Sequence, residues 1–117
     1  YVNMTKILKI EANFKKGYNK SVKCFNRKGK VFYEKNVLSK DVTESMKYGI
    51  DGILDQKRIE KGDVTEYKSF YKNGNILKER KYVNGLSDGE WKEYYIDGSI
   101  KSIIKFKKSK VISIERF

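Results

Sequence analysis

Two seven-residue stretches decide the fold: FYKNGNI at residues 70–76 and YYIDGSI at residues 94–100, which align without a gap at a spacing of 24. The match extends on both sides, because Tyr67 falls on Trp91 and Tyr82 falls on Phe106. Each stretch places an Asn-Gly or Asp-Gly pair between aromatic and aliphatic residues. Such a pair is the strongest short hairpin signal, since a type I′ turn needs positive φ at both central residues. The two stretches therefore predict two equivalent β-hairpins.

The same frame extends over four units. Glycines at 29, 52, 74 and 98 are separated by 23, 22 and 24 residues. Four positions before each glycine is an aromatic residue, and two positions after it is a branched aliphatic one. These columns hold Phe25, Tyr48, Phe70 and Tyr94, then Val31, Leu54, Ile76 and Ile100. A third column, eight positions after each glycine, holds Val37, Glu60, Tyr82 and Phe106. We predict a single repeat domain over residues 1–117, with units centred on Gly29, Gly52, Gly74 and Gly98.

The last unit predicts a register. With Asp97 and Gly98 as a two-residue loop, Tyr95 faces Ile100, and Trp91 faces Ile104. Strand alternation then predicts one face with Trp91, Tyr95, Ile100, Ile104 and Phe106, and another with Lys92, Lys101 and Lys105. The pattern has a period of two, as in a strand, and not 3.6.

A second set of turns must join the hairpins. Gly17, Gly62 and Gly85 lie about 12 residues before the turn glycines, and Lys40 holds that place in the second unit. The chain is therefore predicted to be all-β, an elongated antiparallel meander of eight to ten strands in an open single-layer sheet. We expect strands near 6–14, 21–27, 30–37, 53–60, 65–71, 76–83, 89–95, 100–107 and 110–116. Over 37–48, a helix begun by Ser39, Asp41 and Glu44 competes with a strand at 42–48. The repeat frame favours the strand.

Composition limits the class of protein. Only 38% of the residues are hydrophobic and 36% are charged, which favours a sheet with a wide solvated surface over a globule with a dry interior.

Cys24 is the only cysteine, so no internal disulfide forms, and we expect an unreactive thiol there. No apolar run approaches the roughly 20 residues of a membrane span. The chain begins with Tyr1, so both a cytoplasmic protein and an exported one with its leader removed stay open.

Enzymatic chemistry is not predicted. The chain has no histidine, which removes Ser-His and Cys-His nucleophilic pairs and histidine metal sites. It has no glycine-rich phosphate-binding motif either. The carboxylate pairs Glu90 with Glu93 and Asp63 with Glu66 each lie near a predicted strand and beside lysines, so we expect solvated surface roles for them. We therefore expect no catalytic residue, no cofactor and no bound metal.

The formal charge is +12, from 27 Lys and Arg against 15 Asp and Glu. This excess suits an acidic protein surface, an anionic lipid or a nucleic acid, and it is also what a lysine-rich composition gives without any partner. Nucleic acid ranks lowest, because arginine is the preferred residue for phosphate and only four arginines are present. Five lysines near the C-terminus form a predicted lysine strip: Lys101, Lys105, Lys107, Lys108 and Lys110. We expect the strip either to bind anionic lipid headgroups or to block edge-to-edge aggregation of the sheet.

The stretch GEWKEYYIDG at residues 89–98, and FYKNG at 70–74 followed by YVNG at 82–85, resemble MORN repeats of the bacterial variant type. The resemblance is strongest over 62–107 and extends back over 17–61. It implies an elongated, curved sheet of stacked hairpins. It also implies a scaffolding or binding role, which in bacteria includes antitoxin-like proteins, and membrane-lipid binding has been proposed for the family. The chain departs from the pattern at Lys40, Glu60 and Ser109.

Three functions follow as hypotheses. The first is a non-enzymatic protein-interaction module, antitoxin- or immunity-like in one version, whose repeat aromatics form the binding face unless they only pack hairpins together. That face is Tyr67, Tyr71, Tyr82, Trp91, Tyr95 and Phe106. The second is peripheral binding to anionic membrane lipids through the lysine strip. The third is nucleic-acid binding. The open edges of such a sheet also permit self-association.

Overall fold

The computed structural model describes residues 9–14 and 20–117, and side chains from Ser21 onward. All regular structure in this part of the chain is β-strand. The strands are β1 Lys9–Phe14, β2 Lys20–Phe25, β3 Val31–Ser39, β4 Val42–Tyr48, β5 Leu54–Lys61, β6 Val64–Phe70, β7 Ile76–Val83, β8 Leu86–Ser87, β9 Gly89–Tyr94, β10 Ile100–Lys107 and β11 Lys110–Arg116. The strand predicted at 42–48 is confirmed as β4, and the competing helix is wrong.

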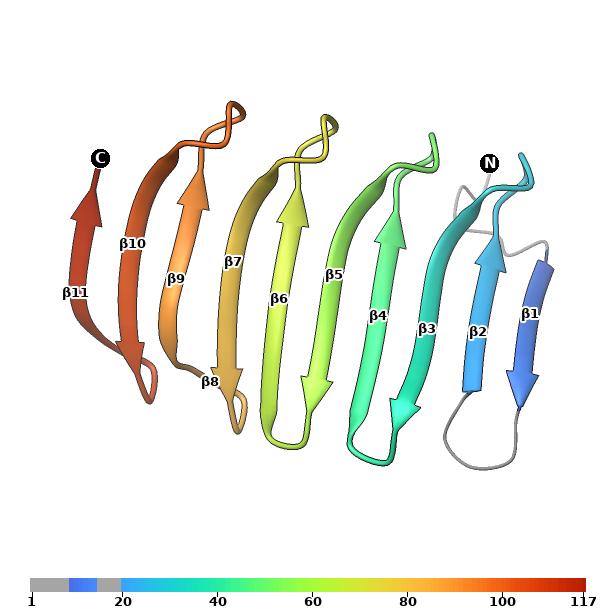
Figure 1. The fold of residues 1–117 in the computed structure, drawn as a ribbon, viewed down its shortest axis with the longest axis horizontal. Helices are drawn as coiled ribbons and strands as arrows, with labels where there is room; N and C mark the ends of the chain where they lie inside the picture. The colour runs from blue at the N-terminus through green and yellow to red at the C-terminus, as the bar shows by residue number, and fades with distance from the viewer. Residues whose placement is uncertain (1–8, 15–19) are drawn as a thin grey trace, which may run out of the picture.

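The strands form one antiparallel meander. Ten of them lie in chain order, with β8 paired to β7 off this path, and β1 and β11 at opposite edges (Figure 1). The predicted all-β meander is confirmed. The short β8 was not predicted, and the predicted residues 6–8 and the turn at Gly17 lie outside the described residues.

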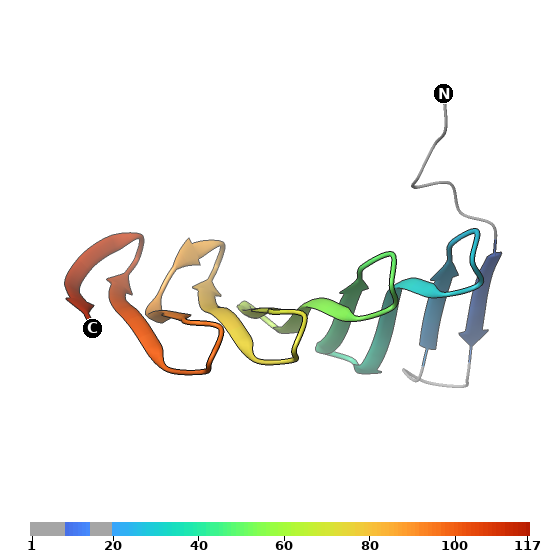
Figure 2. The ribbon, with the colours of Figure 1, turned by 90° about the horizontal axis from the view of Figure 1, so that it is seen from above.

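The sheet is a single open layer (Figure 2). Among the described side chains only Cys24, Met46 and Ser69 are buried. The radius of gyration is 16.6 Å, whereas a compact chain of this length has about 13 Å. The strands are therefore held together by their hydrogen-bond ladders and by side-chain rows on the two faces, not by a dry core.

One row of turns, here called the glycine-turn row, lies at one end of the strands and comprises residues 26–30, 49–53, 71–75 and 95–99. In the last of them, the Tyr95 amide donates to the Ser99 carbonyl, and the Gly98 amide donates to the Tyr95 carbonyl. Gly98 alone among the loop residues has a positive φ, of 94°. This is a three-residue loop, a type I turn followed by a left-handed glycine. The predicted two-residue type I′ turn is wrong here.

The side chain before the glycine accounts for this geometry. The Asp97 carboxylate accepts a hydrogen bond from the Ser99 amide at 2.8 Å, across the glycine. Asn73 does the same for the Asn75 amide at 2.9 Å. An Asx side chain that holds the backbone two residues on stabilises the turn, and glycine supplies the left-handed residue.

The register changes next to these turns. Tyr94 pairs with Ile100, and a β-bulge at Lys101 then restores the predicted pairing of Trp91 with Ile104. The prediction that Trp91, Ile104 and Phe106 share a face is therefore right. It is wrong for Tyr95, which lies in the turn, and for Ile100, which lies with Tyr94 on the other face. Equivalent register shifts follow the other three turns and leave Phe32, Asp55 and Leu77 as the bulged residues.

The opposite row of turns uses two-residue loops. Asn84 and Gly85 both have positive φ, and so do Lys108 and Ser109, as a type I′ turn requires. Ser39 pairs with Val42 around Lys40 and Asp41, which do not adopt positive φ. Lysine can therefore take the place of glycine at position 40. The register shift at residue 38 accommodates the different turn geometry.

Backbone hydrogen bonds link successive turns of this second row. The Gly62 amide donates to the Asp41 carbonyl at 3.0 Å, the Asn84 amide to the Asp63 carbonyl at 2.9 Å, and the Ser109 amide to the Ser87 carbonyl at 2.9 Å. This end of the sheet is therefore connected through the backbone, so the side chains that bridge turns matter most in the glycine-turn row.

Candidate binding face

The register assigns the paired strand residues to two faces. The face that carries Trp91 is called the Trp91 face, and the other the Met46 face. Along the middle of the Trp91 face, neighbouring strands contribute one side chain each to a cross-strand row: Lys35, Ser45, Arg58, Tyr67, Arg80, Trp91, Ile104 and Ile114. Arginine and aromatic residues alternate at the centre of this row.

The arginine–aromatic ladder, Arg58–Tyr67–Arg80–Trp91, is the most distinctive feature of the face. Tyr67 pairs with Arg58 on β5 and with Arg80 on β7. The Arg80 guanidinium carbon lies 4.8 Å from the centre of a Trp91 ring. Such a cation–π contact contributes about 0.5–1 kcal/mol at an exposed site. The ladder therefore holds its side chains in order without burying them.

Trp91 is packed between two further rings. The Tyr82 ring centroid lies 5.2 Å away at an interplanar angle of 67°, and the Phe106 ring 4.7 Å away at 52°. The Trp91 indole N–H donates to the Lys81 carbonyl at 3.0 Å. All three rings stay half-buried. These contacts fix an apolar patch that remains accessible to solvent.

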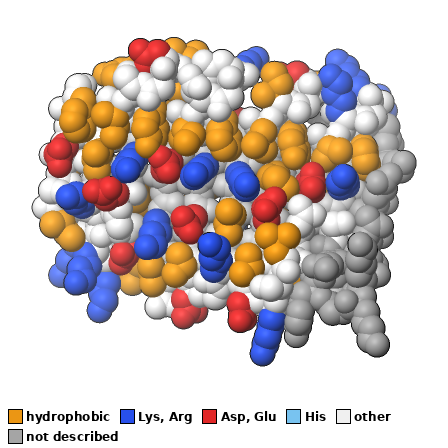
Figure 3. Space-filling view, viewed as in Figure 1, with side chains coloured by type: hydrophobic (Ala, Val, Ile, Leu, Met, Phe, Trp, Pro, Cys, Tyr) orange, Lys and Arg blue, Asp and Glu red, His pale blue; other side chains and the backbone are white. Residues whose placement is uncertain are grey.

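The two faces differ in their balance of charge. Counting strand residues from Ser21 onward without the bulged ones, the Trp91 face has six basic and two acidic residues, and the Met46 face has nine and six. On the Met46 face, lysines and glutamates are interspersed below a band of hydrophobic side chains (Figure 3). Three of the four arginines lie on the Trp91 face: Arg58, Arg80 and Arg116. This face is therefore the one suited to an acidic surface.

A hollow of about 340 Å³ adjoins the ladder on this face. It is lined by Tyr33, Ser45, Lys47, Gln56, Arg58 and Tyr67. Its lining is basic, aromatic and amide or hydroxyl, with no carboxylate among the residues named. A carboxylate side chain of a partner would find a guanidinium, an ammonium group and several hydrogen-bond donors there.

The structure divides the predicted aromatic face in two. Tyr67, Tyr82, Trp91 and Phe106 lie on the Trp91 face. Tyr71 and Tyr95 lie in the glycine-turn row, where the Tyr71 hydroxyl donates to the Tyr94 carbonyl at 2.7 Å. The six residues therefore do not form one continuous patch.

The structure also divides the lysine strip. Lys105 lies on the Met46 face, 3.7 Å from the Glu90 carboxylate. Lys101 is the bulged residue and lies 3.5 Å from Glu93 and 5.9 Å from the Tyr95 ring. The other three, Lys107, Lys108 and Lys110, surround the β10–β11 turn and make no ion pair within the described residues.

Sequence reasoning missed Arg58, Arg80 and Tyr33. A signal for the first two was present, since a column six positions after each turn glycine holds Lys35, Arg58, Arg80 and Ile104. Tyr33 falls outside every aromatic column of the repeat. Only the cross-strand register brings it beside Lys47.

Two tyrosines with raised pKa lie on the Met46 face. Burial, together with the hydrogen bond that its hydroxyl donates to the Glu79 carboxylate, raises the pKa of Tyr94 to about 12. Burial and the nearby Glu34 carboxylate raise the pKa of Tyr48 in the same way, and its hydroxyl lies 3.3 Å from that carboxylate. Each phenol thus acts as a cross-strand hydrogen-bond donor.

Neither a metal cluster nor a membrane-spanning helix is found within residues 9–14 and 20–117. No three His, Cys, Asp or Glu side chains gather there as a metal site would need, and no helix there is long and apolar enough to cross a membrane.

No protein-family profile matches the chain, and no curated protein matches it significantly.

Proposed function

We propose that the chain is a non-enzymatic binding module of MORN-type repeats that docks an acidic surface of a protein partner on the Trp91 face. The observation that carries this proposal is the Arg58–Tyr67–Arg80–Trp91 ladder. Tryptophan, tyrosine and arginine are the residues that dominate binding energy at protein interfaces. Here they lie side by side at the middle of a sheet face, where Tyr67, Arg80 and Trp91 are half-buried and Arg58 is exposed.

The openness of the sheet supports a docking role. An antiparallel sheet commonly packs one face on a core and leaves the other to water. Both faces of this sheet carry apolar side chains, yet only three side chains in the described part are buried. The part of the Tyr82, Trp91 and Phe106 rings that is still exposed would be removed from water only when something covers this face.

A protein partner suits the ring geometry better than a nucleic acid does. Bases stack on open aromatic faces. The Trp91 ring instead packs against Tyr82 and Phe106 at steep angles and has the Arg80 guanidinium next to it. The patch therefore resembles a pre-packed protein contact surface. An antitoxin- or immunity-like role is one version of this function, which the MORN resemblance suggests.

Two matched double variants test the proposal. Arg58→Gln with Arg80→Gln neutralises two charges on the Trp91 face. Lys57→Gln with Lys81→Gln neutralises two on the Met46 face, at the neighbouring positions of the same strands. Both variants change the net charge equally, so a loss of unspecific charge attraction would be the same in both. Each is immobilised and exposed to extract of the source cell, the retained proteins are identified, and the dissociation constant is then measured with the purified partner.

We expect the arginine variant to bind the partner at least tenfold more weakly, and the lysine variant to bind within twofold of wild type. Equal weakening by both variants would mean unspecific charge attraction and would contradict the proposal. Binding to anionic vesicles or to single-stranded oligonucleotide at physiological salt, with no protein retained, would contradict it as well.

A further inference from the structure

The four glycine turns share their backbone hydrogen bonds, and one of the positions at which their side chains differ lies at the start of each turn. Three positions before each turn glycine stand Asn26, Gly49, Tyr71 and Tyr95. The Tyr71 side chain reaches into the next unit, where its hydroxyl donates to the Tyr94 carbonyl at 2.7 Å. Glycine at 49 has no side chain to do the same toward the third unit. The turn itself is intact there, since the Gly49 amide donates to the Ile53 carbonyl at 2.9 Å.

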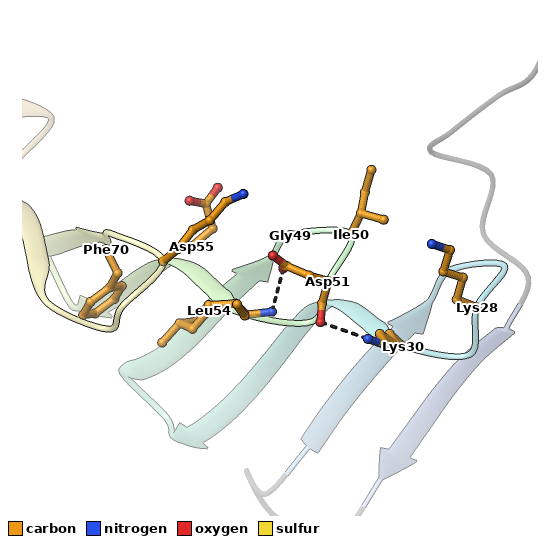
Figure 4. Close-up of a pocket in the computed structure, with 10 residues that line it drawn as sticks. Lys28, Lys30, Gly49, Ile50, Asp51, Leu54, Asp55 and Phe70 are labelled. Carbon is orange, nitrogen blue, oxygen red and sulfur yellow. Dashed lines mark hydrogen bonds between the residues drawn. The ribbon is translucent and has the colours of Figure 1, made fainter.

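A groove of about 560 Å³ lies at Gly49 (Figure 4). It is lined by the first three glycine turns and by the strand ends next to them, chiefly Lys28, Lys30, Ile53, Leu54, Phe70 and Lys72. Two side chains of this turn remain well exposed, Ile50 at 58% and Ile53 at 41%. We call this feature the Gly49 groove.

The repeat shows what fits the groove. Leu54 and Phe70 line it at positions equivalent to Ile76 and Tyr94 in the next unit. The Phe70 carbonyl therefore holds the place of the Tyr94 carbonyl, which accepts the Tyr71 hydroxyl. A phenol entering from outside would meet the apolar side chains of Leu54 and Phe70, and a carbonyl equivalent to the one that accepts the Tyr71 hydroxyl.

The charged residues that line the groove indicate which chemical group a ligand should carry beside its phenol. Three basic residues line the groove, Lys28, Lys30 and Lys72, compared with two carboxylates. One of these, Asp51, is engaged within its own turn, where it accepts from the Ile53 amide at 3.0 Å. The surplus of positive charge favours a ligand with a carboxylate close to its aromatic ring.

We propose that the Gly49 groove binds a tyrosine side chain presented by an acidic peptide segment of a partner. The groove lies at the turn end of the sheet, and its floor residues Leu54 and Phe70 belong to the Met46 side. This site therefore does not depend on the Trp91 face. Either proposal can fail while the other stands.

Small probes test the site without a known partner. N-acetyl-tyrosine is titrated into the isotope-labelled full chain at millimolar concentrations, and amide chemical shifts are followed by NMR. We expect saturable shifts at Ile50, Ile53 and Lys72, and none of comparable size around Trp91. N-acetyl-tyrosine amide lacks the carboxylate and should bind several-fold more weakly, and N-acetyl-leucine should leave these amides unmoved.

Three variants separate groove binding from unspecific effects. Gly49→Tyr should fill the groove from within and weaken probe binding at least tenfold. Gly49→Ala, which adds only a methyl group, should retain it. Tyr71→Gly should open a second groove, so that shifts appear at Asn73 and Ile96 as well.

The added side chain at 49 is tolerable. Its Cβ would lie 2.9 Å from the Asp51 side chain, which must move slightly. Tyr71 and Tyr95 occupy equivalent turns beside Asn73 and Asp97, so the backbone accepts a tyrosine there. Probe binding unchanged in Gly49→Tyr, equal shifts with N-acetyl-leucine, or no shift in the wild type would each overturn the proposal.

Discussion

The second and third turns of the glycine-turn row have the same backbone and different neighbours. In both, an amide three residues before the glycine closes the loop, and an Asx side chain caps the backbone beyond it. Around the third turn, Tyr71, Asn73 and Asn75 all donate to the next unit. Around the second, Gly49, Asp51 and Ile53 supply no such donor, and a groove opens instead.

The difference teaches that turn geometry and contact between units are encoded separately. The Asx-Gly pair fixes the turn in both places. Contact between units depends on the residue at single equivalent positions of the second and third units. One such pair is Gly49 and Tyr71, and another is Glu60 and Tyr82. Glu60 stands in the column where Tyr82 joins the Trp91 cluster in the next unit. The third and fourth units are therefore tied together by side chains. The second unit has side-chain hydrogen bonds toward the first, from Lys30 to the Asp51 carbonyl and from Tyr48 to Glu34, but its turn supplies no such donor toward the third.

The largest expected effect comes from removing the side chain that most strongly ties the C-terminal units. Trp91→Ala loses two ring contacts, the Arg80 contact and one hydrogen bond, so we expect the free energy of unfolding to fall by about 3 kcal/mol. Urea unfolding measures this. The control is Tyr95→Ala, an exposed turn residue, which should cost less than about 1 kcal/mol. Equal losses would contradict the distinction between a packed aromatic residue and an exposed one.

A reciprocal exchange tests the comparison itself. Tyr71→Gly should lower the free energy of unfolding by about 2 kcal/mol, because it removes ring burial and a hydrogen bond. Gly49→Tyr should raise it by about 1 kcal/mol, since a ring then bridges to the Phe70 carbonyl. If both substitutions destabilise equally in thermal and urea unfolding, the two turns do not differ in the way described.

A third prediction concerns the turn backbone. Gly74 has φ of 92°, and no neighbouring atom lies within 4 Å of the place that a Cβ would take. Gly74→Ala should therefore cost about 1–2 kcal/mol through backbone strain alone. Gly74→Asn should cost less, because asparagine tolerates the left-handed region. A cost near zero for alanine in urea unfolding would mean that the three-residue loop is not formed.

The opposite turn row offers a stabilising change. Lys108 and Ser109 have φ of 47° and 66° without being glycine. Lys108→Asn with Ser109→Gly gives the preferred pair for a type I′ turn, and we expect a gain of about 1 kcal/mol in the free energy of unfolding. The same exchange at Lys40 and Asp41, where φ is not positive, should bring no gain and serves as the control.

The smallest effect is the pH dependence of the hydrogen bond that Tyr94 donates to Glu79. A folded-state pKa of about 12 for Tyr94 lies above the usual 10, so its stabilising contribution is complete below pH 10 and is lost as pH rises through 12. The stability difference between wild type and Tyr94→Phe should therefore shrink between pH 8 and pH 11.5 in urea unfolding. A difference that grows over this range would contradict the assignment.

Much of the fold follows from local sequence. The aromatic and aliphatic columns predict the strands, because their spacing returns the chain on itself at each Asx-Gly pair. The turn type does not follow, since Asp97-Gly98 suits both a two-residue loop and a three-residue loop with a left-handed glycine. The bulge at Lys101 decides between them, and a bulge leaves no mark in a hydrophobic pattern.

The candidate face was only partly predictable. Trp91, Tyr82 and Phe106 are evident from their columns. Arg58 and Arg80 are single residues among many basic ones, and their alignment with Tyr67 arises from pairing across three strands. The Gly49 groove depends on a missing side chain, which is recognised only when the neighbouring turn shows what a tyrosine does there.

The central claim is that the chain is one open layer whose faces are accessible for docking. Small-angle X-ray scattering of the full chain, extrapolated to zero concentration and with the mass checked for a monomer, measures this most directly. A radius of gyration near 17 Å is predicted from the 16.6 Å of the structure. A monomer value near 13 Å, that of a compact globule, would contradict the account.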